Sequence, residues 1–160
     1  MKTSEKAALL FLAVLFAAAW GFGYSDYEDI FDATYPLAAG GTVALENING
    51  DVIIEVWDAS EVRVQAVKSA SSQDLLDRLK IDVDADGSSL RIDTIYPSNR
   101  RSAEDRHDYA ESEKRRHMKV EYTLTIPRSA MVNDVDLVNG NLTVVGVEGG
   151  VDAETVNGDI

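Results

Sequence analysis

The sequence Leu-Val-Asn-Gly-Asn-Leu at residues 137–142 returns as Thr-Val-Asn-Gly-Asp-Ile at residues 155–160. An earlier copy, Asn-Ile-Asn-Gly-Asp-Val, occupies residues 47–52. Each copy sets Asn-Gly between apolar side chains, and both residues tolerate positive φ, so the dipeptide predicts a tight corner between two strands. The residues expected to form structural corners are Asn49, Gly50, Asn139, Gly140, Asn157 and Gly158.

Two architectures use such corners. In a hairpin, Leu137 would face Leu142 within one sheet. In a solenoid, each Asn-Gly marks a corner of one coil, and successive coils stack on each other. Gly140 and Gly158 are 18 residues apart, which is near the period typical of stacked repeats. Gly50 precedes Gly140 by 90 residues, a multiple of 18 that we treat as a coincidence, and the local pattern fits both architectures.

Alternating patterns extend outward from the corners. Residues 52–57, 62–68 and 120–127 alternate apolar and polar side chains and are rich in Val and Ile, which is typical of half-buried strands. One short helix is expected near residues 72–80, capped by Ser71 or Ser72, with three leucines on one face. The prediction is an all-β fold with one short helix, as a single-stranded β-helix (solenoid) or, alternatively, an antiparallel β-sandwich.

These motifs resemble a bacterial family of adhesin-like exported proteins, which is defined by strand repeats of the form Val-Asn-Gly-Asp-Ile. The similarity rests on residues 41–64 and 120–159 and covers roughly residues 30–160, apart from one charged stretch. The resemblance implies a single-stranded β-helix in an exported protein. Because the shared motifs are structural corners, it implies no catalytic residues.

The N-terminus predicts export. Lys2 and Lys6 precede an apolar run at residues 7–19 that ends in three alanines, the pattern of a secretory signal peptide. We assign residues 1–23 to the signal, 24–29 to a leader and 30–160 to the β-repeat domain. The expected location is the periplasm, the cell surface or the extracellular space, and contact with a membrane is expected only if the signal stays uncleaved.

Two further segments stand out. Residues 98–117 mix Arg and Lys with Asp and Glu and carry almost no apolar side chain, so we expect a charged excursion from the domain. The chain stops in mid-repeat at Gly158-Asp159-Ile160. We therefore expect a longer protein, and a C-terminal edge able to self-associate.

Composition excludes several classes of protein. The formal charge is −13, and an acidic surface repels nucleic acid and anionic lipid. The sequence contains no cysteine, so it has no disulfide framework, thiolate metal site or cysteine nucleophile.

The strongest metal-ligand motif is Asp82-Val83-Asp84-Ala85-Asp86-Gly87. Its acidic positions, Asp82, Asp84 and Asp86, match the first half of a calcium loop, but position 12 is Asp93 where glutamate is usual. A hairpin with the three aspartates facing solvent explains the same residues, and we prefer it. Calcium is therefore kept only as an alternative, and no other cofactor is expected.

Signals of catalysis are weak. His107 and His117 lie in the charged excursion without helical spacing or cysteines, which is a poor metal site. Asp136, Asp152 and Glu154 are available for a lyase on a β-helix, but residues 132–160 contain no Lys or Arg. Neither GxSxG, HExxH nor a P-loop occurs.

Trp57, Tyr96 and Tyr122 could stack on a ligand, although packing explains them better. The sequence thus predicts a non-catalytic envelope protein, an adhesin-like binding or scaffold module for an unknown envelope or surface ligand. The alternatives are a carbohydrate-active enzyme on a β-helix and a calcium-stabilised binding module.

Overall fold

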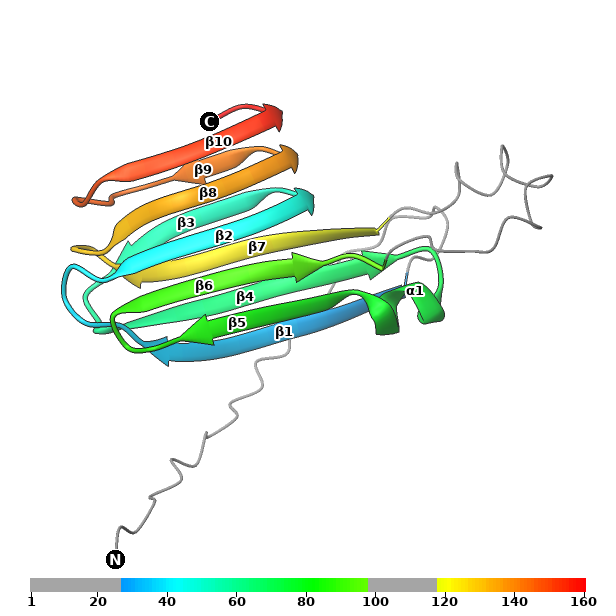
Figure 1. Ribbon diagram of the computed structural model, residues 1–160, viewed down its shortest axis with the longest axis horizontal. Helices are drawn as coiled ribbons and strands as arrows, with labels where there is room; N and C mark the ends of the chain where they lie inside the picture. The colour runs from blue at the N-terminus through cyan, green and yellow to red at the C-terminus, as the bar shows by residue number, and fades with distance from the viewer. Residues whose placement is uncertain (1–26, 98–117) are drawn as a thin grey trace, which may run out of the picture.

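The computed structural model describes residues 27–97 and 118–160, which form two five-stranded β-sheets (Figure 1). In spatial order, the first sheet consists of β1 (Tyr27–Pro36), β4 (Glu61–Ala70), β7 (Met118–Pro127), β3 (Val52–Trp57) and β9 (Leu142–Val144). The second consists of β10 (Val151–Asn157), β8 (Met131–Asn139), β2 (Thr42–Asn49), β6 (Ser89–Ile95) and β5 (Lys80–Ala85). The all-β prediction is confirmed.

Both sheets are mixed. In the first, β7, β3 and β9 run parallel, whereas β1, β4 and β7 pair antiparallel. In the second, β6, β2, β8 and β10 run parallel, and β5 pairs antiparallel with β6. A purely antiparallel sandwich is therefore not what the chain forms.

The Asn-Gly corners carry the chain from one sheet to the other. β2 lies in the second sheet and β3, which follows Asn49-Gly50, lies in the first; β8 and β9 are related in the same way across Asn139-Gly140. The hairpin interpretation is therefore wrong at these corners, because Leu137 and Leu142 belong to different sheets.

The corners also stack on one another. Gly50 donates its N–H to the carbonyl of Asn139 at 3.0 Å, and Gly140 donates to the carbonyl of Asn157 at 3.2 Å. A Cβ on Gly140 would lie 2.1 Å from the carbonyl oxygen of Gly50, and one on Gly158 would lie 2.0 Å from that of Gly140. Of the corner residues only Gly50 has positive φ, at +122°. At positions 140 and 158 glycine is therefore needed because the backbones approach closely, and not for positive φ.

Stacking does not follow chain order. The unit β2–β3 lies between β6–β7 on one side and β8–β9 on the other, as the stacked ribbons show (Figure 1). A simple solenoid would add each coil onto the one before it in sequence. Here the earliest of these units occupies the middle.

One hydrophobic core lies between the sheets. Leu45 and Val135 from the second sheet and Ile54 and Leu124 from the first are fully buried within it. Besides Ser69, at 2% exposed, one polar residue of the described chain is buried, namely Asn47 at 3% exposed. Its amide donates to the carbonyl of Val120 at 2.9 Å and its oxygen accepts from the Tyr96 hydroxyl at 2.9 Å, so its burial leaves no polar group unsatisfied.

The predicted helix is present as α1 (Gln73–Arg78). Ser72 caps it, because its side chain accepts from the N–H of Leu75 at 3.3 Å. Leu75 and Leu76 are buried against Ala70. No helix among the described residues has the length and apolar character of a membrane span.

The predicted domain boundaries need one correction. Residues 27–29 belong to β1, where Asp29 pairs with Lys68 of β4, so they are not part of a leader. The signal at 1–23, the rest of the leader and the excursion at 98–117 lie outside the described residues.

Candidate functional site

The outer surface of the second sheet carries a row of carboxylates, one from each strand. Glu154 of β10 pairs with Asp136 of β8, which pairs with Glu46 of β2. Glu46 also pairs with Asp93 of β6, which pairs with Asp82 of β5. We call these five residues the acidic row. Neighbouring strands lie about 4.8 Å apart, so the row extends over about 19 Å.

Strand alternation turns this row outward. Val135 and Leu137, on either side of Asp136, are buried in the core, whereas Asp136 is exposed. Successive side chains of a strand point to opposite faces. Every residue that pairs directly with Asp136 therefore faces solvent with it.

Arg91 of β6 supplies positive charge at one end of this face. Its guanidinium contacts Glu46 and lies 3.3 Å from both Asp93 and Asp134. The hydrogen bond to Asp134, followed by the charges of Asp93 and Glu46, raises the pKa of Arg91 above its ordinary value. Within residues 27–97 and 118–160, no ion pair joins Asp136, Glu154 or Asp82 to a cation.

A β-bulge brings Asp134 to Arg91. The register of β8 against β2 shifts between Val43 and Leu45, so β8 has one residue more than β2 in this interval. Asp134 lies in the extra length with φ of 68°, the only positive φ of a non-glycine residue in the described chain. Bulges of this kind redirect a side chain at sites where its position matters.

A row of exposed apolar side chains lies beside the acidic row. Two residues beyond the acidic position on each parallel strand stand Ile95 (51% exposed), Ile48 (43%), Val138 (38%) and Val156 (67%). We call these four residues the apolar row. At about 3.3 Å per residue, the two rows run side by side about 7 Å apart.

Both rows are unusual on the exposed face of a β-sheet. Like charges directly opposite each other on neighbouring strands destabilise a sheet, and contiguous exposed apolar side chains are unusual on a protein that meets only water. Departures from local consistency concentrate at functional sites. The outer face of the second sheet is therefore the candidate binding surface.

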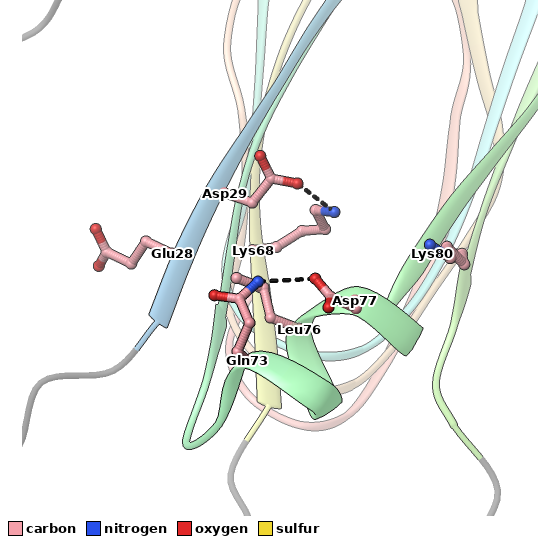
Figure 2. Close-up of a pocket in the computed structure, with 7 residues that line it drawn as sticks. All are labelled: Glu28, Asp29, Lys68, Gln73, Leu76, Asp77 and Lys80. Atoms are coloured by element: carbon pink, nitrogen blue, oxygen red, sulfur yellow. Dashed lines mark hydrogen bonds and ion pairs between the residues drawn. The ribbon is translucent and has the colours of Figure 1, made fainter.

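A shallow polar pocket lies where α1 meets β1 and β4, with a volume of about 410 Å³ (Figure 2). Lys68 pairs with Asp29 at 2.6 Å, and the Gln73 amide donates to Asp77 at 2.7 Å. The first of these pairs joins β4 to β1 and the second lies within α1, so neither interaction crosses from the helix to the sheet.

The residues of the calcium motif are placed on the β5–β6 hairpin, where Val83 pairs with Ile92. Asp82 belongs to the acidic row and Asp84 pairs with Arg91. Asp86 lies in the turn, accepting from the backbone of Ser88 at 2.8 Å and of Ser89 at 2.7 Å, and these bonds, Ser88 first, lower the pKa of Asp86 to about 2. Among the described residues no three metal-ligating side chains converge, and calcium binding stays an untested prediction.

Carboxylates considered for lyase chemistry lie on the same face. Asp136 and Glu154 are paired members of the acidic row, and Asp152 is exposed two residues before Glu154. His107 and His117 lie outside the described residues.

The three aromatic residues support the architecture. Tyr122 is 2% exposed in the core, and its hydroxyl lies 2.8 Å from the Thr94 hydroxyl; burial raises its pKa. The Tyr96 hydroxyl donates to Asn47 and accepts from the N–H of Asn49 at 3.1 Å. The Trp57 indole donates to the Glu61 carbonyl at 2.7 Å.

Sequence reasoning missed the acidic row, although a signal for it exists. When the three copies are aligned on Asn-Gly, each reads acidic–any–Ile/Val–Asn–Gly, beginning at Glu46, Asp136 and Glu154. Residues 93–97, Asp-Thr-Ile-Tyr-Pro, form a fourth copy that has lost its Asn-Gly. The repeat is defined by the corner and the inward-facing apolar residues, so the outward-facing carboxylates stand outside the motif.

No protein-family model and no curated protein sequence matches the chain. Its fold is similar to a candidate cell adhesion protein from Clostridium sporogenes, with 10% identity and a TM-score of 0.44, covering 84% of this chain and 57% of that one. A candidate adhesin from Bacteroides fragilis shows 9% identity and a TM-score of 0.36, covering 79% of this chain and 53% of that one.

A candidate lipid binding protein from Parabacteroides distasonis shows 11% identity and a TM-score of 0.33, covering 73% of this chain and 40% of that one. The chain thus spans little more than half of the adhesin-type structures and less than half of the third.

Proposed function

We propose that this chain is a non-catalytic, exported envelope protein that acts as an adhesin-like binding or scaffold module. The observation that carries the proposal is the outer face of the second sheet, where the acidic and apolar rows run side by side across successive strands. A face that repeats the same pair of side chains at a constant strand spacing suits contact with an extended partner.

The stacked corners support this role. We propose that β2–β3 and β8–β9 act as coils of a β-solenoid, each turning between the sheets at its Asn-Gly corner. The hydrogen bonds between successive corners support this interpretation. Such stacking holds the outer face rigid, so binding requires little ordering of the protein.

Binding to bacterial envelopes tests the proposal. The labelled full chain should bind saturably to envelopes isolated from the bacterium that makes it. A variant with Asp136→Asn, Val138→Thr and Val156→Thr should bind less, whereas Glu61→Gln with Val145→Thr, which changes exposed residues outside this face, should bind normally. Release of reducing sugars from envelope polysaccharide by the wild type, abolished by Asp136→Asn, would favour the carbohydrate-active alternative.

Export rests on Lys2, Lys6 and the apolar run at residues 7–19. Mass spectrometry of the protein outside the cytoplasm should find an N-terminus near residues 20–24. Recovery of the intact chain from Met1 in the cytosol would contradict export.

A further inference from the structure

We propose that the outer face of the second sheet binds a cationic, amphipathic α-helix of a partner protein. The helix would lie across the strands, with Lys or Arg side chains over the acidic row and apolar side chains over the apolar row. This inference rests on the proposed function and names the class of partner for the same surface.

The apolar row is the surface that needs a cover. Its four side chains are between 38% and 67% exposed on four adjacent strands, and removing such area from water is favourable at about 25 cal/mol per Å². A purely apolar partner would leave the neighbouring carboxylates desolvated without counter-charges, which is costly. The adjacent acidic row therefore favours a partner helix that carries one line of apolar side chains and a neighbouring line of cationic side chains.

Charge is unevenly distributed along the acidic row. Arg91 already contacts Glu46 and Asp93 on the β2–β6 side. Asp136 and Glu154, which are paired on β8 and β10, have no cation among the described residues. The strongest attraction for a partner's Lys or Arg is therefore at the β8–β10 end.

The geometry of the rows matches a helix. An α-helix with its side chains is about 10–12 Å across, so one helix covers two rows about 7 Å apart. At 1.5 Å per residue, the length of about 19 Å corresponds to roughly 13 residues of helix. Residues three and four apart share one side of a helix, which places a cationic line next to an apolar line.

A synthetic peptide provides the probe. We would use a peptide of about 15 residues, built of Lys, Leu and Ala, in which lysines form one line of the helix and leucines the adjacent line. One control peptide has the same composition in shuffled order, and another has Glu in place of Lys. The full chain should bind the ordered peptide more tightly than the shuffled one and should not bind the Glu peptide.

Variants then locate the binding surface. Asp136→Asn with Glu154→Gln keeps side-chain shape but removes two charges, and each should weaken binding about two- to fivefold. Val138→Thr with Val156→Thr, which tests the apolar row, should weaken it as well. Glu61→Gln with Val145→Thr is a control outside this face and should bind as the wild type. Thermal melts of each variant check that the fold is kept.

Binding that is equal for ordered and shuffled peptides, or unchanged in both row variants, would overturn the inference. Failure here is distinguishable from failure of the proposed function. Envelope binding that survives the row variants keeps a binding module but places its site elsewhere. A chain that binds no envelope while the ordered peptide binds through the rows would instead refute the envelope function and leave the helix-binding surface standing.

Discussion

Asn139 donates a hydrogen bond from its side-chain amide to the side-chain oxygen of Asn49 at 2.9 Å, across 90 residues of sequence. Asn157 donates in the same sense to Asn139 at 3.0 Å. A second series runs beside it, because Asp51 accepts from the N–H of Asn141 and Asn141 accepts from that of Asp159. The corners are therefore joined through side chains as well as backbone, like the asparagine ladders of stacked strands.

Replacing Asn139 with alanine should destabilise the fold. The change removes one hydrogen bond that Asn139 donates and one that it accepts, and since the site is exposed we expect a loss of about 1 kcal/mol in the free energy of unfolding. Urea unfolding followed by circular dichroism measures it. Asn133→Ala on the same strand is the control, since no side-chain hydrogen bond of Asn133 occurs among the described residues. Equal stability of the two variants would show that the ladder contributes nothing.

Glycine at position 140 should be required for steric reasons. In Gly140→Ala the new Cβ would lie 2.1 Å from the carbonyl oxygen of Gly50, so the corner must shift, at a cost of about 1–3 kcal/mol. Gly150→Ala is the control, because nothing lies within 4 Å of a Cβ there. Thermal melts of the two variants should differ clearly. If Gly140→Ala melts at the same temperature as Gly150→Ala, the backbones of residues 50 and 140 do not approach closely.

The ion pair of Asp32 with Arg63 should make stability depend on pH. Two contacts of 3.0 and 2.6 Å join them, and the hydrogen bond from Arg63 lowers the pKa of Asp32 below its ordinary value of 3.8. A lowered pKa in the folded state contributes stability above pH 3.8, and this contribution disappears as pH falls through the folded value. Asp32→Asn should therefore cost up to about 1 kcal/mol at neutral pH.

The difference between wild type and Asp32→Asn should shrink once pH falls below about 4. Chemical denaturation of both proteins across this range measures it. A difference that stays constant with pH would assign the effect of the substitution to packing rather than to charge.

Neutralising the acidic row should stabilise the protein at low salt. Asp136 pairs with Glu46 and Glu154, so Asp136→Asn relieves two like-charge contacts and should add about 0.2–1 kcal/mol. The gain should vanish near 1 M salt, where screening acts over about 3 Å. Glu61→Gln removes the same net charge away from the row and is the control. Stabilisation by both variants to the same degree would point to net charge alone.

Local features of the fold could be predicted from the sequence. The Asn-Gly corners, the strands around them and the cap at Ser72 depend on residues close in the chain. Alternation in residues 120–127 correctly predicted that Val120, Tyr122, Leu124 and Ile126 face the core. These inferences succeed because period and capping are local properties.

Long-range order could not be predicted in the same way. The sequence pattern does not tell which strands pair across the 90 residues between Gly50 and Gly140, so stacking of Asn49 on Asn139 escaped prediction. The acidic position recurs in the sequence repeat, but that Glu46, Asp93 and Asp136 are neighbours follows only from that stacking. The need for glycine at position 140 likewise comes from a carbonyl that lies far away in sequence.

The central position of β2 and β3 also determines when the domain can fold. Val52 of β3 pairs only with Tyr122 and Leu142, and β2 pairs with β6 and β8. A ribosome that has made residues 42–57 has therefore released two core strands whose neighbours do not yet exist. Strand pairs so distant in sequence form slowly, because the entropy of closing the loop is lost before the stabilising contacts form. We expect β2 and β3 to gain their first strand neighbours only when β6 and β7 have emerged, and their second only with β8 and β9.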